Sequence, residues 1–336
     1  MDTSYIRQLS HEYHPATRTA QYVAVNDADK NLVLAMADMG IFTAHSFPTY
    51  WESAVAASRP RWLVVDANWA DRDIRAWARA GQRCGARIAF EPVSVEKSAR
   101  LFCKSHGHQQ QQKNHSGKKL ESLEGLGVFP TASVDLATPN QHELAAMHAA
   151  ARENEYLEDA RWWGVVNALG LPHGGARDRF VRLTSARMTD AGIPQQAVQL
   201  LPYIPTIVTK LGAEGALLTT VLRPDDPRLR DAASEPYILS RSLGGDSSPD
   251  VGGVYMRLYP AAERVENVAS VNGVGDTFLG VLIAGLARGG RVEDLVDVAQ
   301  KGATLTLRSR ESVSEDLAGL ERELVAAATV TAGKDN

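Results

Sequence analysis

From Thr19 onward the hydrophobic and polar positions follow regular periods, and the first is the two-residue period of β-strands. Two β-rich runs between Thr19 and Met36 flank a turn rich in Asn and Asp, which predicts a β-hairpin. Further along, short apolar runs end in polar residues, which is typical of buried strands in a parallel sheet. We expect strands at residues 62–65, 86–90, 133–136, 206–209, 216–221 and 254–259.

Helical periodicity fills most of the intervals between these strands. Helices are predicted at about 50–57, 70–84, 145–169, 177–201, 292–309 and 316–328. Because strands alternate with helices, the pattern predicts an α/β fold around a parallel sheet. We expect a single domain over residues 1–330, with a polar low-complexity insertion at about 104–122 and an irregular insertion at about 222–253.

The composition narrows the class of protein without changing this picture. The chain has 336 residues, of which 44% are hydrophobic and 23% charged, and its net charge is -4. These values are ordinary for a soluble globular protein and give no reason to expect nucleic acid or a membrane as partner. Only Cys84 and Cys103 are cysteines, and the N-terminus has no signal-peptide pattern, so we expect a cytoplasmic protein.

The strongest candidate for chemistry is a glycine-rich stretch that leads into an apolar helix. Gly273 and Gly275 flank Val274, and Asp276 lies in the first turn of that helix. Backbone N–H groups at a helix start have no partner within the helix, and the helix dipole adds positive potential, so this stretch suits a phosphate. Asp276 could cap the helix or accept a proton from an attacking hydroxyl. Taken alone, the motif fits a turn or cap as well as a phosphate site.

Two further motifs also allow two interpretations each. Asn140 and Glu143 follow a predicted strand, either as part of a helix start with Thr138 as N-cap or as a site for hydrated Mg²⁺ or phosphate. Gly212 and Gly215 follow another strand, where glycines permit a tight hairpin or a close approach to a nucleotide.

Polar residues also end the first two predicted strands of the sheet. These are Asp66, Asn68 and Glu91, which either face a substrate pocket or cap neighbouring helices. Ligands of open α/β sheets bind outside the carboxyl ends of the strands, which is where these side chains are expected.

The order of the motifs resembles one family. A strand followed by Asn140-x-x-Glu143, a strand followed by Gly212-x-x-Gly215, and then Asn272-Gly273-Val274-Gly275-Asp276 is similar to the ribokinase (PfkB) family of carbohydrate and nucleoside kinases. Two sequence motifs most resemble the pseudouridine kinases within that family. They are Asn-Gly-Val-Gly-Asp-Thr-Phe-Leu-Gly and Ala-Thr-Pro-Asn-Gln-His-Glu-Leu. The resemblance covers roughly residues 17–328.

This resemblance implies a ribokinase-like three-layer sandwich with a mostly parallel central sheet and a small β lid at about residues 17–40. It also implies phosphoryl transfer from ATP to a sugar or nucleoside hydroxyl, most specifically that of pseudouridine. Asp276 would be the base, and the amides of Gly273, Val274 and Gly275 would form an anion hole for the transferring group.

The remaining expected site residues are also implied by the resemblance. Asn140 and Glu143 would organise Mg²⁺ near the phosphates. The nucleotide would lie against Lys210, Gly212, Gly215, Ala303 and Leu307. The substrate would contact Asn68, Glu91 and Asp38, beneath the lid.

Two departures from the family pattern qualify these expectations. Ser270-Val271 replaces the usual Asp-Thr ahead of the glycine motif, which weakens the inference of a K⁺ site. The usual first strand–helix unit is not found before Thr17, so a truncated, non-catalytic nucleotide-binding relative is the alternative. Expected partners are a small-molecule sugar or nucleoside, a second copy of the chain through the lid, and an upstream pseudouridine-5′-phosphate glycosidase domain.

Overall fold

The predicted hairpin is present in the computed structural model, which describes residues 18–27, 32–44, 49–104, 125–171, 176–242 and 248–329. Its strands are β1 (Gln21–Asn26) and β2 (Leu32–Asp38), and they pair antiparallel. Most of the insertion expected at 104–122, and the residues before Arg18, lie outside the described residues.

The other elements follow the predicted alternation of strands and helices. The central strands are β3 (Trp62–Asp66), β4 (Arg87–Glu91), β5 (Leu136–Ala137), β6 (Thr206–Lys210), β7 (Ala216–Leu222), β8 (Ile238–Arg241) and β9 (Gly253–Tyr259). The helices up to the middle of the chain are α1 (Gly40–Ala44), α2 (Thr49–Ser58), α3 (Asp71–Arg83), α4 (Val95–Ser98), α5 (Gln141–Glu153) and α6 (Ala160–Ala168). The later helices are α7 (Arg177–Leu183), α8 (Ala186–Asp190), α9 (Ile193–Leu200), α10 (Val274–Ala287), α11 (Val292–Arg308) and α12 (Glu321–Thr329).

The central sheet has seven strands in the order β3-β4-β5-β6-β7-β9-β8. Strands β3 to β6 are mutually parallel, whereas β7 pairs antiparallel with both β6 and β9, and β8 pairs antiparallel with β9. Five strands (β3, β4, β5, β6 and β9) therefore run in one direction and two run in the other. The sheet is mixed but mostly parallel, as expected.

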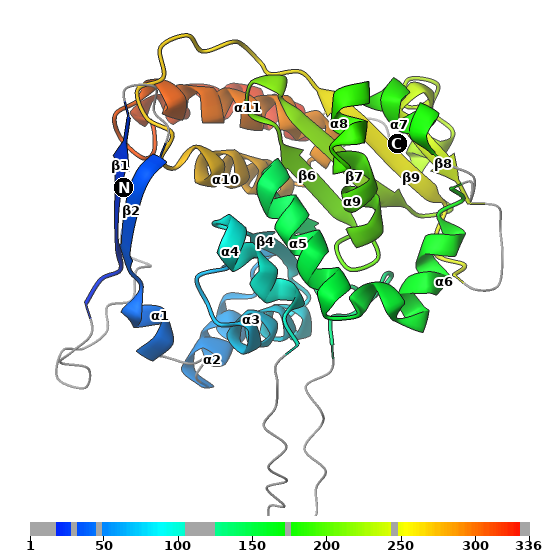
Figure 1. The fold of residues 1–336 in the computed structure, drawn as a ribbon, viewed down its shortest axis with the longest axis horizontal. Helices are drawn as coiled ribbons and strands as arrows, with labels where there is room; N and C mark the ends of the chain where they lie inside the picture. The colour runs from blue at the N-terminus through cyan, green and yellow to red at the C-terminus, as the bar shows by residue number, and fades with distance from the viewer. Residues whose placement is uncertain are drawn as a thin grey trace, which may run out of the picture.

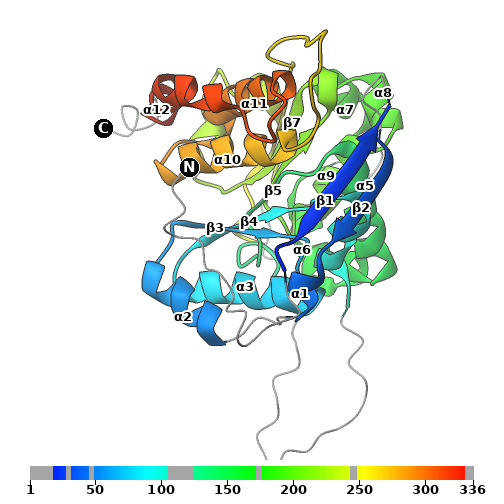
Figure 2. The ribbon, with the colours of Figure 1, turned by 90° about the vertical axis from the view of Figure 1, so that its left-hand side faces the viewer.

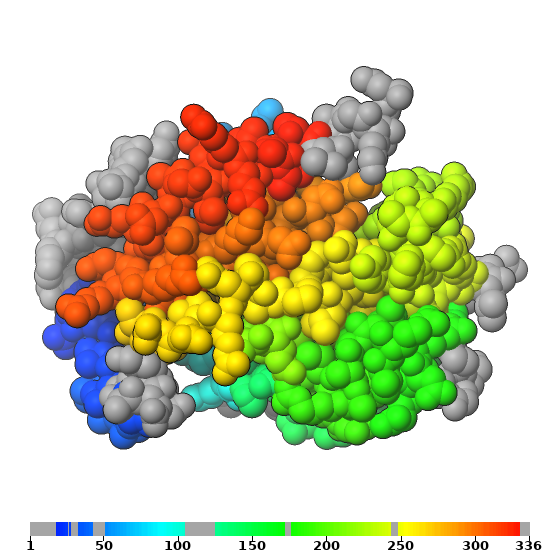
Figure 3. Space-filling model, turned by 90° about the horizontal axis from the view of Figure 1, so that it is seen from above, coloured from blue at the N-terminus to red at the C-terminus, as the bar shows by residue number. Residues whose placement is uncertain are grey.

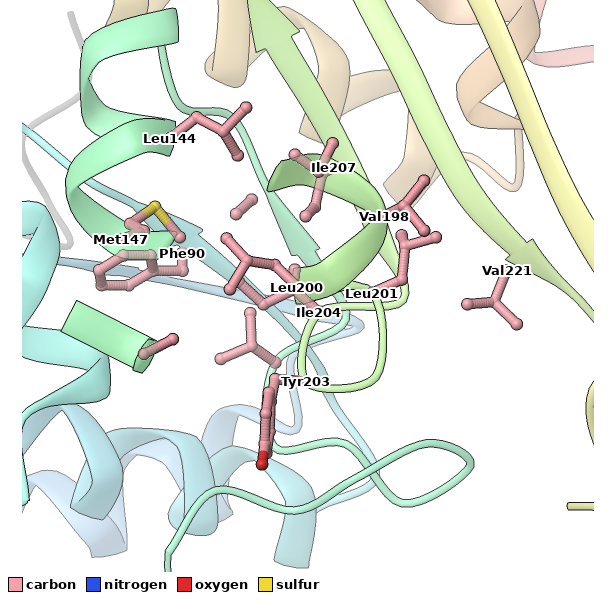
Figure 4. Close-up of a cluster of buried hydrophobic side chains, with 14 of the residues drawn as sticks. Phe90, Leu144, Met147, Val198, Leu200, Leu201, Tyr203, Ile204, Ile207 and Val221 are labelled. Carbon is pink, nitrogen blue, oxygen red and sulfur yellow. The ribbon is translucent and has the colours of Figure 1, made fainter. Parts of the chain in front are cut away.

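Alternate residues of the strands face two separate cores, one on each side of the sheet. On β4, Ile88 and Phe90 belong to the core beneath α3, α5 and α9, whereas Ala89 belongs to the core beneath α10, α11 and α12. This two-residue alternation is the pattern of a sheet that is covered on both faces. Figure 1 shows the two helical layers, and Figure 4 shows Phe90 beside Leu144 and Met147 of α5 in the first core. The predicted three-layer sandwich is thereby confirmed.

Four predicted segments differ from the structure. The long helices expected at 145–169 and 177–201 are each broken, because Glu155 and Gly192 adopt left-handed conformations and Ser185 caps a new helix start. The insertion at 222–253 contains the edge strand β8, which has only four residues and little alternation to reveal it. The last predicted helix begins as a 3₁₀ segment at Glu315–Leu320 before α12.

The hairpin stands on the side of the molecule where α10 begins (Figure 1), and it lies beside β3, β4 and β5 when that side faces the viewer (Figure 2). Because α10 begins where β4, β5 and β6 end, their carboxyl ends lie on the same side. The space-filling view shows an open gap between the hairpin and the green part of the body (Figure 3). The fold therefore brings the strand ends, the start of α10 and the hairpin to one side.

Candidate active site

The loop before α10 has a conformation that only glycine accommodates. Gly273 is the N-cap of α10 and has a φ of 73°, in the left-handed region. A Cβ atom added there would lie 1.8 Å from the carbonyl oxygen of Ser312, so the backbone itself excludes a side chain. The first bond of the helix runs from the Thr277 N–H to the Gly273 carbonyl at 2.8 Å. Among the described residues, no acceptor binds the N–H groups of Val274 and Gly275, which remain available to an anion.

Lys210 places a positive charge beside this helix start. It is the last residue of β6, and a Cβ added to Gly275 would lie 3.0 Å from its Nζ atom. The same Nζ lies 3.5 Å from Oε1 of Glu91, and only 18% of the lysine side chain is exposed. A cation and free amides thus converge on one small space at the start of α10, which is the chemistry of a phosphate site.

Glu91 is the buried centre of the site and not a residue of an open pocket wall. It ends β4, is 6% exposed, and accepts a 2.8 Å hydrogen bond from the Thr138 hydroxyl. Burial raises the pKa of the Glu91 carboxyl above its ordinary value; Lys210 and the Thr138 hydrogen bond oppose this, and the charges of Glu143 and Asp276 add to it. Glu91, Glu143, Asp276 and Lys210 are therefore close enough to interact electrostatically.

Asn140 and Glu143 form a capping box at the start of α5. The Asn140 side chain accepts the N–H groups of His142 and Glu143 at 2.9 Å, and Glu143 Oε2 accepts the Asn140 N–H at 2.7 Å. Asn140 is therefore the N-cap, and the expectation that Thr138 fills this role is wrong, since its hydroxyl binds Glu91. Among the described residues, only one carboxylate oxygen of Glu143 is used in this box.

A backbone bridge joins this capping box to Lys210. Asn140 and Lys210 form an isolated parallel bridge, and the Lys210 N–H donates to the Pro139 carbonyl at 2.8 Å. The motifs that the sequence separates by about seventy residues are thereby adjacent.

The two glycines after β6 favour the tight-hairpin interpretation. Gly212 begins a single 3₁₀ turn, and Gly215 has a φ of 96°. A Cβ added to Gly215 would lie 1.9 Å from the carbonyl oxygen of Tyr259, so this glycine is required where β7 packs against β9.

Ala303 and Leu307 lie on α11, which packs against the glycine loop. The Leu307 carbonyl accepts the Ala269 N–H at 2.8 Å, and the hydroxyls of Thr277 and Thr306 lie 2.9 Å apart. Ala303 packs half-buried against the core beneath α10. These contacts fix α11 to the start of α10, and the role of Ala303 and Leu307 in nucleotide binding stays a prediction.

Asn68 and Asp38 make no described contact with Glu91, Lys210 or the start of α10. Asn68 follows β3 and is held by Asp66 at 3.2 Å and by Lys97 Nζ at 2.7 Å. Asp38 is exposed at the end of β2, where it pairs with Arg18 at 3.2 Å and accepts the Gly40 N–H at 3.2 Å. Asp38 thus stabilises the turn from the hairpin into α1.

Thr138 and Lys97 are polar site residues that the sequence analysis did not select. Thr138 directly follows β5, and this strand-end position is a signal that could have found it, whereas Lys97 lies in α4 and has no such signal. Burial lowers the pKa of Lys97, and the nearby charge of Arg100 acts in the same direction.

The described residues lack two features. They contain no group of three or more His, Cys, Asp or Glu side chains placed to hold a metal ion. None of the helices in the described ranges combines the length and the apolar character that crossing a membrane would require.

Comparison with known proteins finds similarity to one protein family and to one curated relative. Residues 248–317, which include the glycine loop, match the family model for "pfkB family carbohydrate kinase". The chain is 29% identical over 310 residues to a pseudouridine-metabolizing bifunctional protein of Schizosaccharomyces pombe, covering 89% of this chain and 35% of that protein. Over the matched residues the chain is similar to the carbohydrate kinases of the PfkB family. It spans about a third of the length of this curated relative.

Solved structures with a similar arrangement include two kinases. One is a Burkholderia thailandensis nucleoside kinase in complex with inosine, with 12% identity, a TM-score of 0.49, and coverage of 97% of this chain and 73% of that one. Another is Arabidopsis thaliana ribokinase complexed with ribose and ATP, with 12% identity, a TM-score of 0.49, and coverage of 92% of this chain and 69% of that one.

Proposed function

We propose that this chain transfers a phosphoryl group from ATP to a hydroxyl of a sugar or nucleoside. The observation that carries the proposal is the convergence of Lys210 Nζ and the free N–H groups of Val274 and Gly275 on the helix start that bears Asp276. Phosphoryl transfer requires positioned positive charge and donors around the transferring group and a base near the attacking oxygen. This helix start combines all three.

Each residue then has a defined role. Asp276 accepts the hydroxyl proton of the substrate as that oxygen attacks the γ-phosphorus, while the bond to the ADP oxygen breaks. The amides of Gly273, Val274 and Gly275 stabilise the charge of the transferring group. Lys210 adds positive charge to the same oxygens, and Glu91 holds the lysine in place from behind.

Magnesium would be bound through Glu143. Mg²⁺ in kinases keeps several waters and is held by one or two carboxylates together with the phosphates of the substrate. The free carboxylate oxygen of Glu143 fits this requirement, whereas the Asn140 side chain is already committed to the capping box. When bound, the ion neutralises negative charge on the phosphates.

Pseudouridine is the acceptor that we propose. The relative named above is described as metabolizing pseudouridine, and the quoted motifs lie within the aligned length. The polar set of Asp66, Asn68 and Lys97 at the end of β3 and α4 offers both donors and acceptors for a polar base. Since the relative is bifunctional, we further propose that a second pseudouridine-related activity accompanies the kinase in the natural polypeptide.

We also propose that a second copy of the chain covers one face of the hairpin. Val23, Val25, Leu34 and Met36 share that face in the antiparallel register, and between 47% and 56% of each residue is exposed. Contiguous apolar faces of this kind mark interaction sites in soluble proteins. The opposite face would close over the sugar and exclude water from the reaction.

The kinase proposal is tested by Mg²⁺-ATP-dependent phosphorylation of pseudouridine, with uridine, ribose and adenosine measured in parallel. We expect turnover that favours pseudouridine and falls about a hundredfold or more in an Asp276→Asn variant that still binds ATP. ATP binding without turnover on any acceptor would overturn the proposal in favour of the non-catalytic nucleotide-binding alternative.

A further inference from the structure

A cavity of about 340 Å³ lies at the opposite end of the sheet from the proposed active site. Its wall is formed by the amino ends of four parallel strands, at Trp62, Arg87, Leu136 and Thr206, and by the turn between α10 and α11. The same strands end at the proposed active site, so the two sites are separated by the length of the strands. For the five residues of β6 that length is about 13–17 Å.

The deeper charged residues of this cavity neutralise one another. Arg228 donates to Asp226 at 2.8 Å and to Glu293 at 3.1 Å, and only 15% of its side chain is exposed. Arg291 approaches Glu293 at 3.4 Å. The interior is therefore close to balanced in charge, and it leaves no uncompensated cation at depth.

Two arginines at the rim, Arg87 and Arg223, keep most of their hydrogen-bonding capacity. The guanidinium of Arg87 lies 5.7 Å from the centre of the Trp62 ring, and within the described ranges no carboxylate forms an ion pair with it. The guanidinium of Arg223 lies 5.3 Å from the Phe129 ring, and its ion pair with Asp250 is long, at 3.5 Å. Stacking on a ring holds the plane of a guanidinium and leaves its N–H edge free for an oxyanion.

One acid lines the cavity without an arginine partner. The Asp135 carboxylate accepts the Ile88 N–H at 2.7 Å, which engages it with the backbone. Burial raises the pKa of this carboxyl, while the Ile88 hydrogen bond and the charge of Arg87 oppose the increase. Asp135 therefore reduces the positive potential near Arg87 only in part.

We propose that this cavity is a second binding site for a small phosphate monoester, which Arg87 and Arg223 bind through its phosphate group. A guanidinium edge can donate two hydrogen bonds to the oxygens of a phosphate group, and both arginines line this one cavity. The volume is at the lower end of the range for small-molecule sites and suits a compound the size of a phosphorylated sugar. Such a ligand would contact the turn after α10 and the first residues of β4 and β6. The opposite ends of these three elements carry Asp276, Glu91 and Lys210, which belong to the proposed active site.

The test is calorimetric titration of the full chain with ribose 5-phosphate, and separately with inorganic phosphate, without ATP or acceptor. The readout is binding alone, so it stands whether or not the chain is a kinase. We expect ribose 5-phosphate to bind, with at least tenfold weaker affinity in Arg87→Ala and in Arg223→Ala. Arg322→Ala, which removes an exposed arginine from α12, should bind as the unaltered chain does. The loss of affinity in the two rim variants should persist when each is combined with Lys210→Ala, which weakens phosphate binding at the proposed active site.

Several outcomes would overturn the proposal. These are rim variants that bind as tightly as the unaltered chain, a loss of affinity in the rim variants that disappears when Lys210 is also replaced by alanine, or no binding at concentrations up to ~10 mM. Tighter binding of inorganic phosphate than of the ester would reject the ester as the ligand class. Because Arg87 also packs on Trp62, Arg87→Lys provides a variant that keeps the charge and stem but loses the fork, and it should lose affinity by a smaller factor.

Discussion

At the residue scale, the site depends on one buried acid. Glu91 is almost fully buried. Among the described residues, its carboxylate accepts a side-chain hydrogen bond from Thr138 and forms an ion pair with Lys210. Its folded-state pKa is raised, so the native protein holds the Glu91 proton at pH values where the unfolded chain has released it. Its contribution to stability is therefore fully present below its ordinary value of 4.5 and is lost as the pH rises through the folded pKa.

A Glu91→Gln variant tests this sign. Glutamine keeps the size and the hydrogen bond to Thr138 but has no proton to release, so the variant should gain stability relative to the unaltered chain as the pH rises from 4.5. The measurement is the free energy of unfolding in urea at several pH values. A difference between the two proteins that does not change with pH would show that Glu91 titrates normally.

The same substitution has a second expected effect, on activity. Without the carboxylate, Lys210 loses the group that holds its Nζ beside Gly275, so phosphorylation should slow by about tenfold. The exposed acid Glu153 on α5 supplies the matched control, and Glu153→Gln should leave the rate unchanged. Equal rates for Glu91→Gln and the control would remove Glu91 from the proposed machinery.

Gly273 carries the sharpest steric prediction. Alanine there must hold a φ of 73° and place its Cβ 1.8 Å from the Ser312 carbonyl, so Gly273→Ala should lower stability by about 1–3 kcal/mol and abolish phosphate binding at this loop. Gly280, seven residues further along the chain in α10, has open space around its Cβ position. Gly280→Ala should therefore raise stability by about 0.5–1 kcal/mol, because alanine favours helix. The measurement is the melting temperature of each variant and of the unaltered chain. Similar melting temperatures for the two variants would contradict the loop geometry.

At the scale of elements, the hairpin exposes an apolar surface. Its apolar face (Val23, Val25, Leu34 and Met36) is largely exposed, which is unusual for a two-stranded element without a partner. If a second copy covers it, Leu34→Lys should place a charge in the interface and convert dimer to monomer. Light scattering at micromolar concentration measures this. Tyr22→Lys, on the opposite face, should leave the dimer intact, and a monomeric unaltered chain would refute the proposal.

Elements also show how far sequence reasoning reached. Short apolar runs that end in polar residues predicted the strands that lead to Glu91, Asn140 and Lys210, because such runs are typical of buried parallel strands. The breaks at Glu155 and Gly192 were not predicted, since left-handed residues depend on tertiary contacts and not on composition. Thr138 was given the wrong role for a similar reason: whether a hydroxyl caps a helix or binds a buried acid is decided by a strand that lies far away in the sequence.

At the scale of the whole molecule, one sheet separates two cores and must hold both. Leu282 of α10 and Met147 of α5 are fully buried on opposite sides of it. Truncating either to alanine leaves a cavity in only one core, at a cost of about 2–5 kcal/mol. Because β4, β6, β7 and β9 contribute side chains to both cores, neither layer can lose its packing while the other remains ordered.

Leu282→Ala and Met147→Ala should therefore each lower the midpoint of a single unfolding transition. Circular dichroism of the peptide groups and fluorescence of the tryptophans, followed in the same urea series, should give coincident midpoints for each variant. The tryptophans report mainly on the first core, where Trp69, Trp77 and Trp162 pack. A Leu282→Ala variant whose helical signal falls before its tryptophan signal would show that the α10 layer, and with it the phosphate-binding loop, unfolds independently of the sheet.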